Sequence, residues 1–403
     1  MATTAIARGA LAIEGGSPVR RTLLPYGRQS IDEDDIRTVV ETLRSEWLTT
    51  GPKVAEFEEA FAERVGAKYA VSFSSGTAAL HGAAFAAGLK DGDEALTSPL
   101  TFVATANCIL YQRATPVFVD VCRDTLNVDP EELQCSISHR TRAILAVDYA
   151  GHPADLEGIL RIADSHGLVV IEDACHALGA KYRERSVGSV AHLTVFSFHP
   201  VKHLTTGEGG MVTTNDVRLA QILRQFRNHG ISSEVRERQA REQWEYEMVL
   251  LGFNYRLTDI GCALGISQLK KLEANLRRRE EIADQYAAAF RGMPELMLPC
   301  VRPDVEPAWH LYPIRLHSGR LAATREQVFR ALRAENIGVN VHYIPVHLHP
   351  YYRNRFGYSG GEYPVAEDAY ERLISLPIFQ GMTDADVDDV ISAVKKVCSA
   401  YCR

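Results

Sequence analysis

The segment Ser197-Phe-His-Pro-Val-Lys-His-Leu-Thr-Thr-Gly-Glu-Gly-Gly210 is the stretch from which the fold can be worked out. An apolar run at 192–198 precedes Lys202 and another at 211–214 follows it, so both runs indicate strands of a buried sheet. A lysine held between such strands can form an imine with an aldehyde cofactor, provided that burial and nearby charge lower its pKa. Taken alone, the same lysine also fits a solvated surface loop.

The composition is typical of a soluble globular protein. The chain has 403 residues, of which 46% are hydrophobic and 24% charged, and this length allows two domains. A net charge of -7 disfavours nucleic acid or an anionic membrane as a partner. The eight cysteines form no C-x-x-C pair, no apolar run approaches the ~18 residues of a membrane span, and the N-terminus lacks a signal-peptide pattern. We therefore expect a reducing, cytoplasmic location.

Strand and helix patterns alternate through the first two thirds of the chain. Helical spacing of apolar residues at 31–43 and 54–65 is followed by seven strand patterns, at 70–73, 94–97, 117–121, 143–148, 168–172, 194–198 and 211–214. Most of these strands are separated by helical segments. The pattern predicts an α/β fold with a mainly parallel seven-stranded sheet between helices, and the ligand site of such a sheet lies at the carboxyl ends of its strands.

The last third of the chain has a different pattern. Helical stretches at 261–276 and 277–290 lead into expected strands at 309–316 and 338–343 and expected helices at 325–335 and 383–398. This arrangement predicts a smaller α+β unit. We expect an N-terminal arm (1–30), a large cofactor-binding domain (31–280) and a small C-terminal domain (281–403).

A possible phosphate site lies where the strand at 70–73 meets the next helix, in Ser74-Ser-Gly-Thr77. Free backbone N–H groups and the helix dipole attract a phosphate there. Gly76 allows a close approach of the backbone, Thr77 adds a hydroxyl, and Ser197 follows a neighbouring strand. A simple helix cap would use the same residues.

Other polar and aromatic residues follow the strand ends. Asp173 follows an apolar strand, so its carboxylate can pair with a cationic ring nitrogen, as pyridoxal chemistry requires. His176 can contact the same ring or order Asp173, and Phe102 can stack on it. Alternative roles are an N-cap for Asp173 and core packing for His176 and Phe102.

Asn254-Tyr-Arg256 lies in a polar turn before a helix. It can supply a phosphate ligand from Asn254, an aromatic contact to the substrate from Tyr255 and a cation from Arg256, or it can simply start the helix. No G-x-G-x-x-G element follows a strand and no G-x-x-x-x-G-K-[S/T] is present. These absences count against a nicotinamide dehydrogenase and a P-loop enzyme.

Taken together, these segments resemble the fold type I pyridoxal-phosphate enzymes and, within them, the DegT-type nucleotide-sugar aminotransferases. The resemblance runs from about residue 25 to the C-terminus. It is carried by Ser75-Gly-Thr77, Pro99-Leu-Thr-Phe-Val-Ala-Thr-Ala-Asn107, Glu172-Asp-Ala-Cys-His-Ala-Leu-Gly179, Ser197-Phe-His-Pro-Val-Lys202, Thr205-Thr-Gly-Glu-Gly-Gly210 and Asn254-Tyr-Arg256.

The resemblance implies a role for each matching residue. Lys202 would carry the pyridoxal 5'-phosphate as an imine, and Asp173 would pair with its pyridine nitrogen. The catalytic residues would thus be Lys202, Asp173 and His176. The cofactor would also be held by Gly76, Thr77, Phe102, Ser197 and Asn254. Because Asn254 would reach the phosphate of a neighbouring subunit, the resemblance implies a homodimer with shared sites.

Within the family, the motifs look most like the enzyme that aminates C4 of a UDP-linked 4-keto-6-deoxy-N-acetyl sugar on the way to pseudaminic acid, with glutamate as the expected amino donor. By that resemblance Tyr26, Trp47, His342 and Tyr343 would line the sugar-nucleotide pocket; packing at the arm and the domain seam would explain them equally well. The segment 11–20 looks more like members that act on other sugars or cyclitols. A sister branch of dehydratases has histidine in place of the lysine, and Lys202 excludes it.

Two other interpretations stay open. One is an aminotransferase for another keto-sugar or a cyclitol. The other is a non-catalytic regulatory homologue, which intact Lys202 and Asp173 disfavour because mere binding needs no reactive amine. A metal site is not expected, because no acidic partner at helical ligand spacing accompanies the histidines of the C-terminal third. These histidines are His310, His342, His347 and His349.

Overall fold

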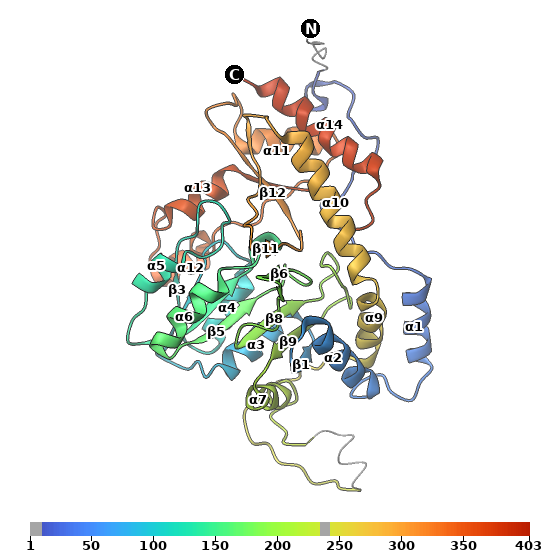
Figure 1. Cartoon of the computed structure of the whole chain (residues 1–403), viewed down its shortest axis with the longest axis vertical. Coiled ribbons are helices and arrows are strands. Elements are labelled where there is room, and N and C mark those ends of the chain that lie inside the picture. Colours follow the sequence, from blue (N-terminus) through green and yellow to red (C-terminus); the bar gives the residue numbers. More distant parts are fainter. Residues whose placement is uncertain (1–9, 234–241) are drawn as a thin grey trace.

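A computed structural model describes residues 10–233 and 242–403 (Figure 1). Its main sheet has seven strands, and β9 runs antiparallel to its neighbours β1 and β8, whereas the other neighbouring pairs are parallel. The mainly parallel seven-stranded sheet expected from the sequence is therefore confirmed. In spatial order the strands are β1 (Tyr69–Phe73), β9 (Gly210–Thr214), β8 (Leu193–Ser197), β5 (Val169–Asp173), β4 (Thr141–Val147), β2 (Glu94–Thr97) and β3 (Thr115–Phe118).

Helices cover both faces of this sheet. On one face, apolar side chains of alternate strand positions pack against α3, α4 and α7, and on the other face against α2, α5, α6 and α9. Strands buried on both sides need apolar residues at every position, which explains the nearly continuous apolar runs. The helices are α2 (Pro52–Val65), α3 (Gly76–Ala86), α4 (Val103–Tyr111), α5 (Pro130–Cys135), α6 (Leu156–His166), α7 (Val217–Arg227) and α9 (Asp259–Leu269); α1 (Glu33–Leu43) lies against α9.

The C-terminal third forms a second core, seen at the top of Figure 1. Its centre is a three-stranded sheet of β10 (Leu296–Met297), β12 (Tyr312–Leu316) and β13 (Leu373–Leu376). Leu11 and Leu24 of the N-terminal arm pack into the same core. The helices that follow the main sheet are α10 (Leu272–Phe290), α11 (Arg325–Ala334), α12 (Pro350–Phe356), α13 (Pro364–Arg372) and α14 (Asp384–Tyr401).

Short elements complete the chain. A small antiparallel sheet joins β6 (Lys181–Tyr182), β7 (Arg185–Ser186) and β11 (Val305–Glu306). Single 3-10 turns are η1 (Ala12–Glu14), η2 (Tyr149–Gly151) and η3 (Val346–Leu348). None of the helices in the described part of the chain has a stretch long and apolar enough to cross a bilayer.

The expectation of a strand at 338–343 is wrong. Only Asn340 makes a β-bridge there, to Ser375 in β13, and the chain then turns away towards the main sheet. The carbonyl oxygen of His342 accepts a hydrogen bond from the Tyr149 hydroxyl (2.6 Å), so this backbone group has a partner without a neighbouring strand. The helices α7, α12 and α13 and the strand β13 had no counterpart in the expected elements. The domain boundary expected at 280/281 falls inside α10, and the division into domains stays a prediction.

Candidate active site

The candidate residues converge at the carboxyl ends of β1, β5 and β8. Asp173 is the last residue of β5, and Ser197 is the last residue of the neighbouring strand β8. Lys202 lies in the connection from β8 to β9, and Gly76 is the first residue of α3, directly after β1. Because β1 pairs with β9 at Phe73–Gly210 and β8 pairs with it at Ser197–Gly210, all these segments share one edge of the sheet.

The amine of Lys202 lies inside the protein, although the residue as a whole is partly exposed. Its Nζ is 3.3 Å from Nε2 of His310. Burial lowers the pKa of Lys202 to about 8, while the charge of Asp173 acts in the opposite direction. Near neutral pH a measurable share of the amine is therefore unprotonated, which a nucleophile or base requires.

Asp173 is fixed by two hydrogen bonds. The Thr105 hydroxyl donates to Oδ2 (2.7 Å) and the backbone N–H of Cys175 donates to Oδ1 (3.2 Å). Thr105 belongs to the first turns of α4, so this helix sets the orientation of the carboxylate. A carboxylate held in this way can bind a cationic ring nitrogen without first reorganising.

Two further carboxyl groups are buried behind Asp173. The backbone N–H of Asp148 donates to the Asp173 carbonyl oxygen (3.1 Å), and Glu172 precedes Asp173 in β5. Burial raises the pKa of Glu172 to about 7 and raises the pKa of Asp148 well above its usual value. Burial therefore disfavours a negative charge on both groups, which limits the negative charge behind the site.

Aromatic rings follow one another from the neighbourhood of Lys202 towards the surface. The His176 ring lies 4.4 Å from the His310 ring, and the Tyr343 hydroxyl is 3.0 Å from Nε2 of His176. Phe102 lies 6.0 Å from the Tyr343 ring and is 56% exposed, so much of this side chain is accessible to a ligand. The Nδ1 atom of His176 is buried, and within residues 10–233 and 242–403 it has no hydrogen-bond partner.

The arm and the segment after α11 pack beside these rings. The Tyr26 ring lies 5.2 Å from the His342 ring, whose Nδ1 is 2.9 Å from the Ser375 hydroxyl. Burial lowers the pKa of His342 to about 4, so this imidazole is neutral. The structure therefore brings Tyr26, His342 and Tyr343 together beside His176.

A cradle that fits a phosphate lies at the start of α3. A Cβ added to Gly76 would lie 2.9 Å from Cβ and 3.1 Å from Oγ of Ser197, so the backbone approaches Ser197 as closely as only glycine permits. Ser75 caps the helix, and the neighbouring Thr77 is partly exposed. Backbone N–H groups at a helix start with two nearby hydroxyls suit a phosphate, and together with Lys202 they fit pyridoxal phosphate.

Gly76→Ala is expected to weaken cofactor binding about tenfold, because the new methyl group must displace Ser197 or the start of α3. Fluorescence titration of the cofactor-free protein with pyridoxal phosphate measures this. Gly381→Ala is the matched control, since its Cβ would meet only Phe379 at 3.7 Å. Equal affinities of the two variants would show that the cradle does not hold the phosphate.

Three of the expected residues lie outside this cluster. Asn254 is exposed in the turn before α9, and the Tyr255 carbonyl oxygen accepts a hydrogen bond from the Ser74 N–H (2.8 Å), so the turn runs beside the phosphate cradle. The Tyr255 ring stacks on Phe253 at 5.0 Å. Trp47 packs over Gly51 at the start of α2. The roles of Asn254, Tyr255 and Trp47 stay predictions.

Sequence reasoning missed two residues that contact the centre of the site. Thr105 lay inside a quoted motif without a role, although a hydroxyl in a mainly apolar helix was a usable signal. His310 was weighed only as a metal ligand, yet it contacts Lys202 across 108 residues of sequence. Local pattern could not reveal this contact, because it depends on how the C-terminal unit packs on the sheet.

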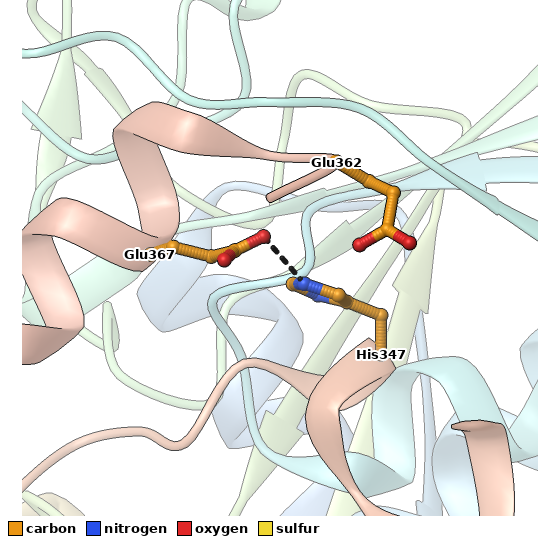
Figure 2. A group of neighbouring side chains, drawn as sticks. All are labelled: His347, Glu362 and Glu367. Atoms are coloured by element: carbon orange, nitrogen blue, oxygen red, sulfur yellow. Dashed lines mark hydrogen bonds and ion pairs between the residues drawn. The ribbon is translucent and has the colours of Figure 1, made fainter. Parts of the chain in front are cut away.

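A separate group of titratable side chains lies on η3 and near the start of α13 (Figure 2). Nε2 of His347 is 2.9 Å from Oε1 of Glu367, and Glu362 lies beside them. The sequence analysis did not identify these acidic neighbours of His347. Each carboxylate already accepts backbone hydrogen bonds, from Ser359 and Gly360 in one case and from Gly361 and Tyr363 in the other. The group closes the turn before α13 by hydrogen bonds within the protein, and we assign it no metal.

The fold and the site define a class of protein. A mainly parallel sheet that places a buried lysine, a strand-end aspartate and a helix-start phosphate cradle at one edge is the fold type I arrangement of pyridoxal-phosphate enzymes. The chain belongs to the DegT/DnrJ/EryC1/StrS aminotransferase family, whose model matches residues 29–395. It is a sugar aminotransferase that uses pyridoxal phosphate.

Three relatives illustrate the similarity. The spore coat polysaccharide biosynthesis protein SpsC of Bacillus subtilis is 46% identical over 380 residues, which cover 94% of this chain and 98% of SpsC. The structure of Helicobacter pylori PseC, an aminotransferase of pseudaminic acid biosynthesis, is similar with a TM-score of 0.88 at 34% identity, covering 94% of this chain and all of PseC. The PLP form of the sugar aminotransferase Spr1654 of Streptococcus pneumoniae has a TM-score of 0.87 at 31% identity, with 94% and 99% covered.

Proposed function

We propose that this enzyme transfers an amino group from glutamate to C4 of a nucleotide-linked 4-keto-6-deoxy sugar, most simply a UDP-linked, N-acetylated one. The similarity to PseC over 94% of the chain supports this substrate class, since PseC acts in pseudaminic acid biosynthesis. The transamination itself is supported above all by one observation: Lys202, which follows β8, and the carboxylate of Asp173, which ends the neighbouring strand β5, lie at the same edge of the sheet.

We propose the following roles for the residues of the chain. Pyridoxal phosphate supplies an aldehyde and an electron-accepting ring when bound. Lys202 would bind the aldehyde carbon and, once released by the amino donor, Nζ would take a proton from the donor Cα and later deliver one to the sugar carbon that is aminated. Asp173 would keep the ring nitrogen protonated, and His176 and Phe102 would enclose the ring.

Binding roles complete the proposal. Gly76, Thr77 and Ser197 would hold the cofactor phosphate. Tyr26, His342 and Tyr343, whose rings pack against one another, would contact the sugar nucleotide. Asn254, Tyr255 and Trp47 would contribute from the surface, and Asn254 would do so to the site of a second copy. The assembly would be a homodimer, as the family resemblance implies, and the scattered cysteines favour a location in the cytoplasm.

The sugar substrate is tested with a panel of keto compounds. The enzyme is first converted to its pyridoxamine form with glutamate, and each candidate is then added while the return of the pyridoxal absorption is followed in a single turnover. A UDP-linked 4-keto-6-deoxy-N-acetyl sugar is expected to react at least about tenfold faster than a cyclitol ketone or a 3-keto isomer. A difference of this size corresponds to the loss of one hydrogen bond between substrate and enzyme.

A faster reaction with the cyclitol or with another keto-sugar would contradict the proposed substrate and favour the alternative suggested by the segment 11–20. The SpsC relative, named for spore coat polysaccharide biosynthesis, makes a sugar the first choice. Failure of glutamate to form the pyridoxamine form, where alanine or glutamine succeeds, would contradict the proposed donor alone.

A further inference from the structure

His310 lies at the centre of the site, although it comes from the segment before β12. Its residue is 4% exposed, and Nε2 is 3.3 Å from Nζ of Lys202. Its ring lies 4.4 Å from that of His176 and 5.6 Å from that of His203. Burial, and then the charge of Lys202, hold the pKa of His310 well below its usual range, so the imidazole is neutral.

The surroundings of the other ring nitrogen decide where the single proton of this neutral imidazole lies. In the part of the chain that the structure describes, Nδ1 of His310 is buried without a hydrogen-bond partner. A buried N–H that lacks an acceptor is rarer and more costly than a buried nitrogen lone pair that lacks a donor. The proton therefore belongs on Nε2, which faces Lys202.

Arg279 holds the backbone at His310 in position. This arginine of α10 is fully buried, and NH1 of its guanidinium donates to the carbonyl oxygens of Trp309 (3.1 Å), His310 (3.4 Å) and Ile378 (3.0 Å). Trp309 has a φ of +50°, so the backbone at this point is in a conformation that neighbouring contacts must hold. The guanidinium provides these contacts.

We infer that His310 is a positioning residue for Lys202: its Nε2–H donates a hydrogen bond to the lone pair of the neutral amine, and Arg279 holds His310 in place through the backbone. This hydrogen bond orients Nζ while the amine is unprotonated and can accept a proton. It also favours the free amine over the ammonium ion, which has no lone pair to accept it. The inference rests on the aminotransferase chemistry of the family and is independent of which sugar is the substrate.

The test measures the protonation of Lys202 directly. The full-length enzyme in its pyridoxamine form, in which Lys202 is free, is labelled with trinitrobenzenesulfonate between pH 6 and pH 11, and modification of Lys202 is quantified by peptide mass spectrometry. In His310→Phe the ring shape is kept and the donor is lost, so the labelling midpoint is expected to rise by about one pH unit, with about tenfold slower labelling at pH 7. His310→Gln keeps an N–H donor near the Nε2 position and is expected to stay within about twofold of the wild type.

The two variants separate positioning from mere packing. An unchanged midpoint in a folded His310→Phe protein would overturn the inference, and so would equal shifts in His310→Phe and His310→Gln, because equal shifts indicate lost packing. Arg279→Lys keeps the positive charge, but its side chain is shorter and lacks the second nitrogen that donates to Gln380, so it is expected to shift the midpoint in the same direction as His310→Phe. An unchanged labelling midpoint in Arg279→Lys would show that Arg279 does not hold His310 in place. Because no sugar is used, these outcomes do not depend on the proposed substrate.

Discussion

Lys202→Ala is expected to abolish the visible absorption band of the lysine-bound cofactor and to lower turnover by at least about 1,000-fold. The side chain has two tasks, as the amine that binds the aldehyde and as the base that moves a proton, and general base catalysis alone contributes about 100- to 10,000-fold. The lowered pKa of about 8 allows this amine to act near neutral pH. Absorption spectra and single-turnover rates with glutamate measure both effects.

A matched lysine provides the control for this prediction. Lys181 forms a surface ion pair with Glu306, and both side chains are well exposed (44% and 67%). Lys181→Ala is therefore expected to keep the band and the rate, because exposed ion pairs contribute little. Lys202→Arg keeps the positive charge, but a guanidinium group does not form an imine at neutral pH. This variant is therefore also expected to lack the band. A band that persists in Lys202→Ala would show that another amine holds the cofactor.

Asp173→Asn is expected to lower turnover about 100- to 1,000-fold while the protein stays folded. The amide has the shape of the carboxylate and can still accept from Thr105, but it carries no charge to keep a ring nitrogen protonated. Loss of one preorganised electrostatic contact in a buried site has an effect of this size. Single-turnover kinetics with glutamate and the measured cofactor content distinguish slower chemistry from weaker binding.

Two neighbouring substitutions show whether the charge or its surroundings matter. Glu172→Gln removes a carboxyl group beside Asp173 whose pKa is raised to about 7, so it should cost far less. Thr105→Val removes only the hydroxyl that orients Asp173 and is expected to cost about tenfold, the size of one hydrogen bond to a charged group. Equal losses in Asp173→Asn and Glu172→Gln would mean that Asp173 acts through packing alone.

Much of the fold was predictable because local pattern is sufficient for buried strands. The strand at 94–97 was predicted with its exact bounds, and the bounds of the other six sheet strands differ by no more than three residues at either end. The segment 338–343 is not a strand, because its apolar residue Val339 is buried in the C-terminal core while only Asn340 makes a β-bridge. Burial of apolar residues in a short segment does not show whether its backbone pairs with a neighbouring strand.

The sequence alone determined the sheet, the helices on its two faces and the lysine and aspartate at its edge, because strand ends in a parallel sheet must meet at one side. The tertiary structure decided which distant side chains complete the site. Tyr343 reaches His176 across 167 residues, and His310 reaches Lys202 across 108. These contacts depend on the packing of the C-terminal unit on the sheet, a long-range arrangement that no local periodicity encodes.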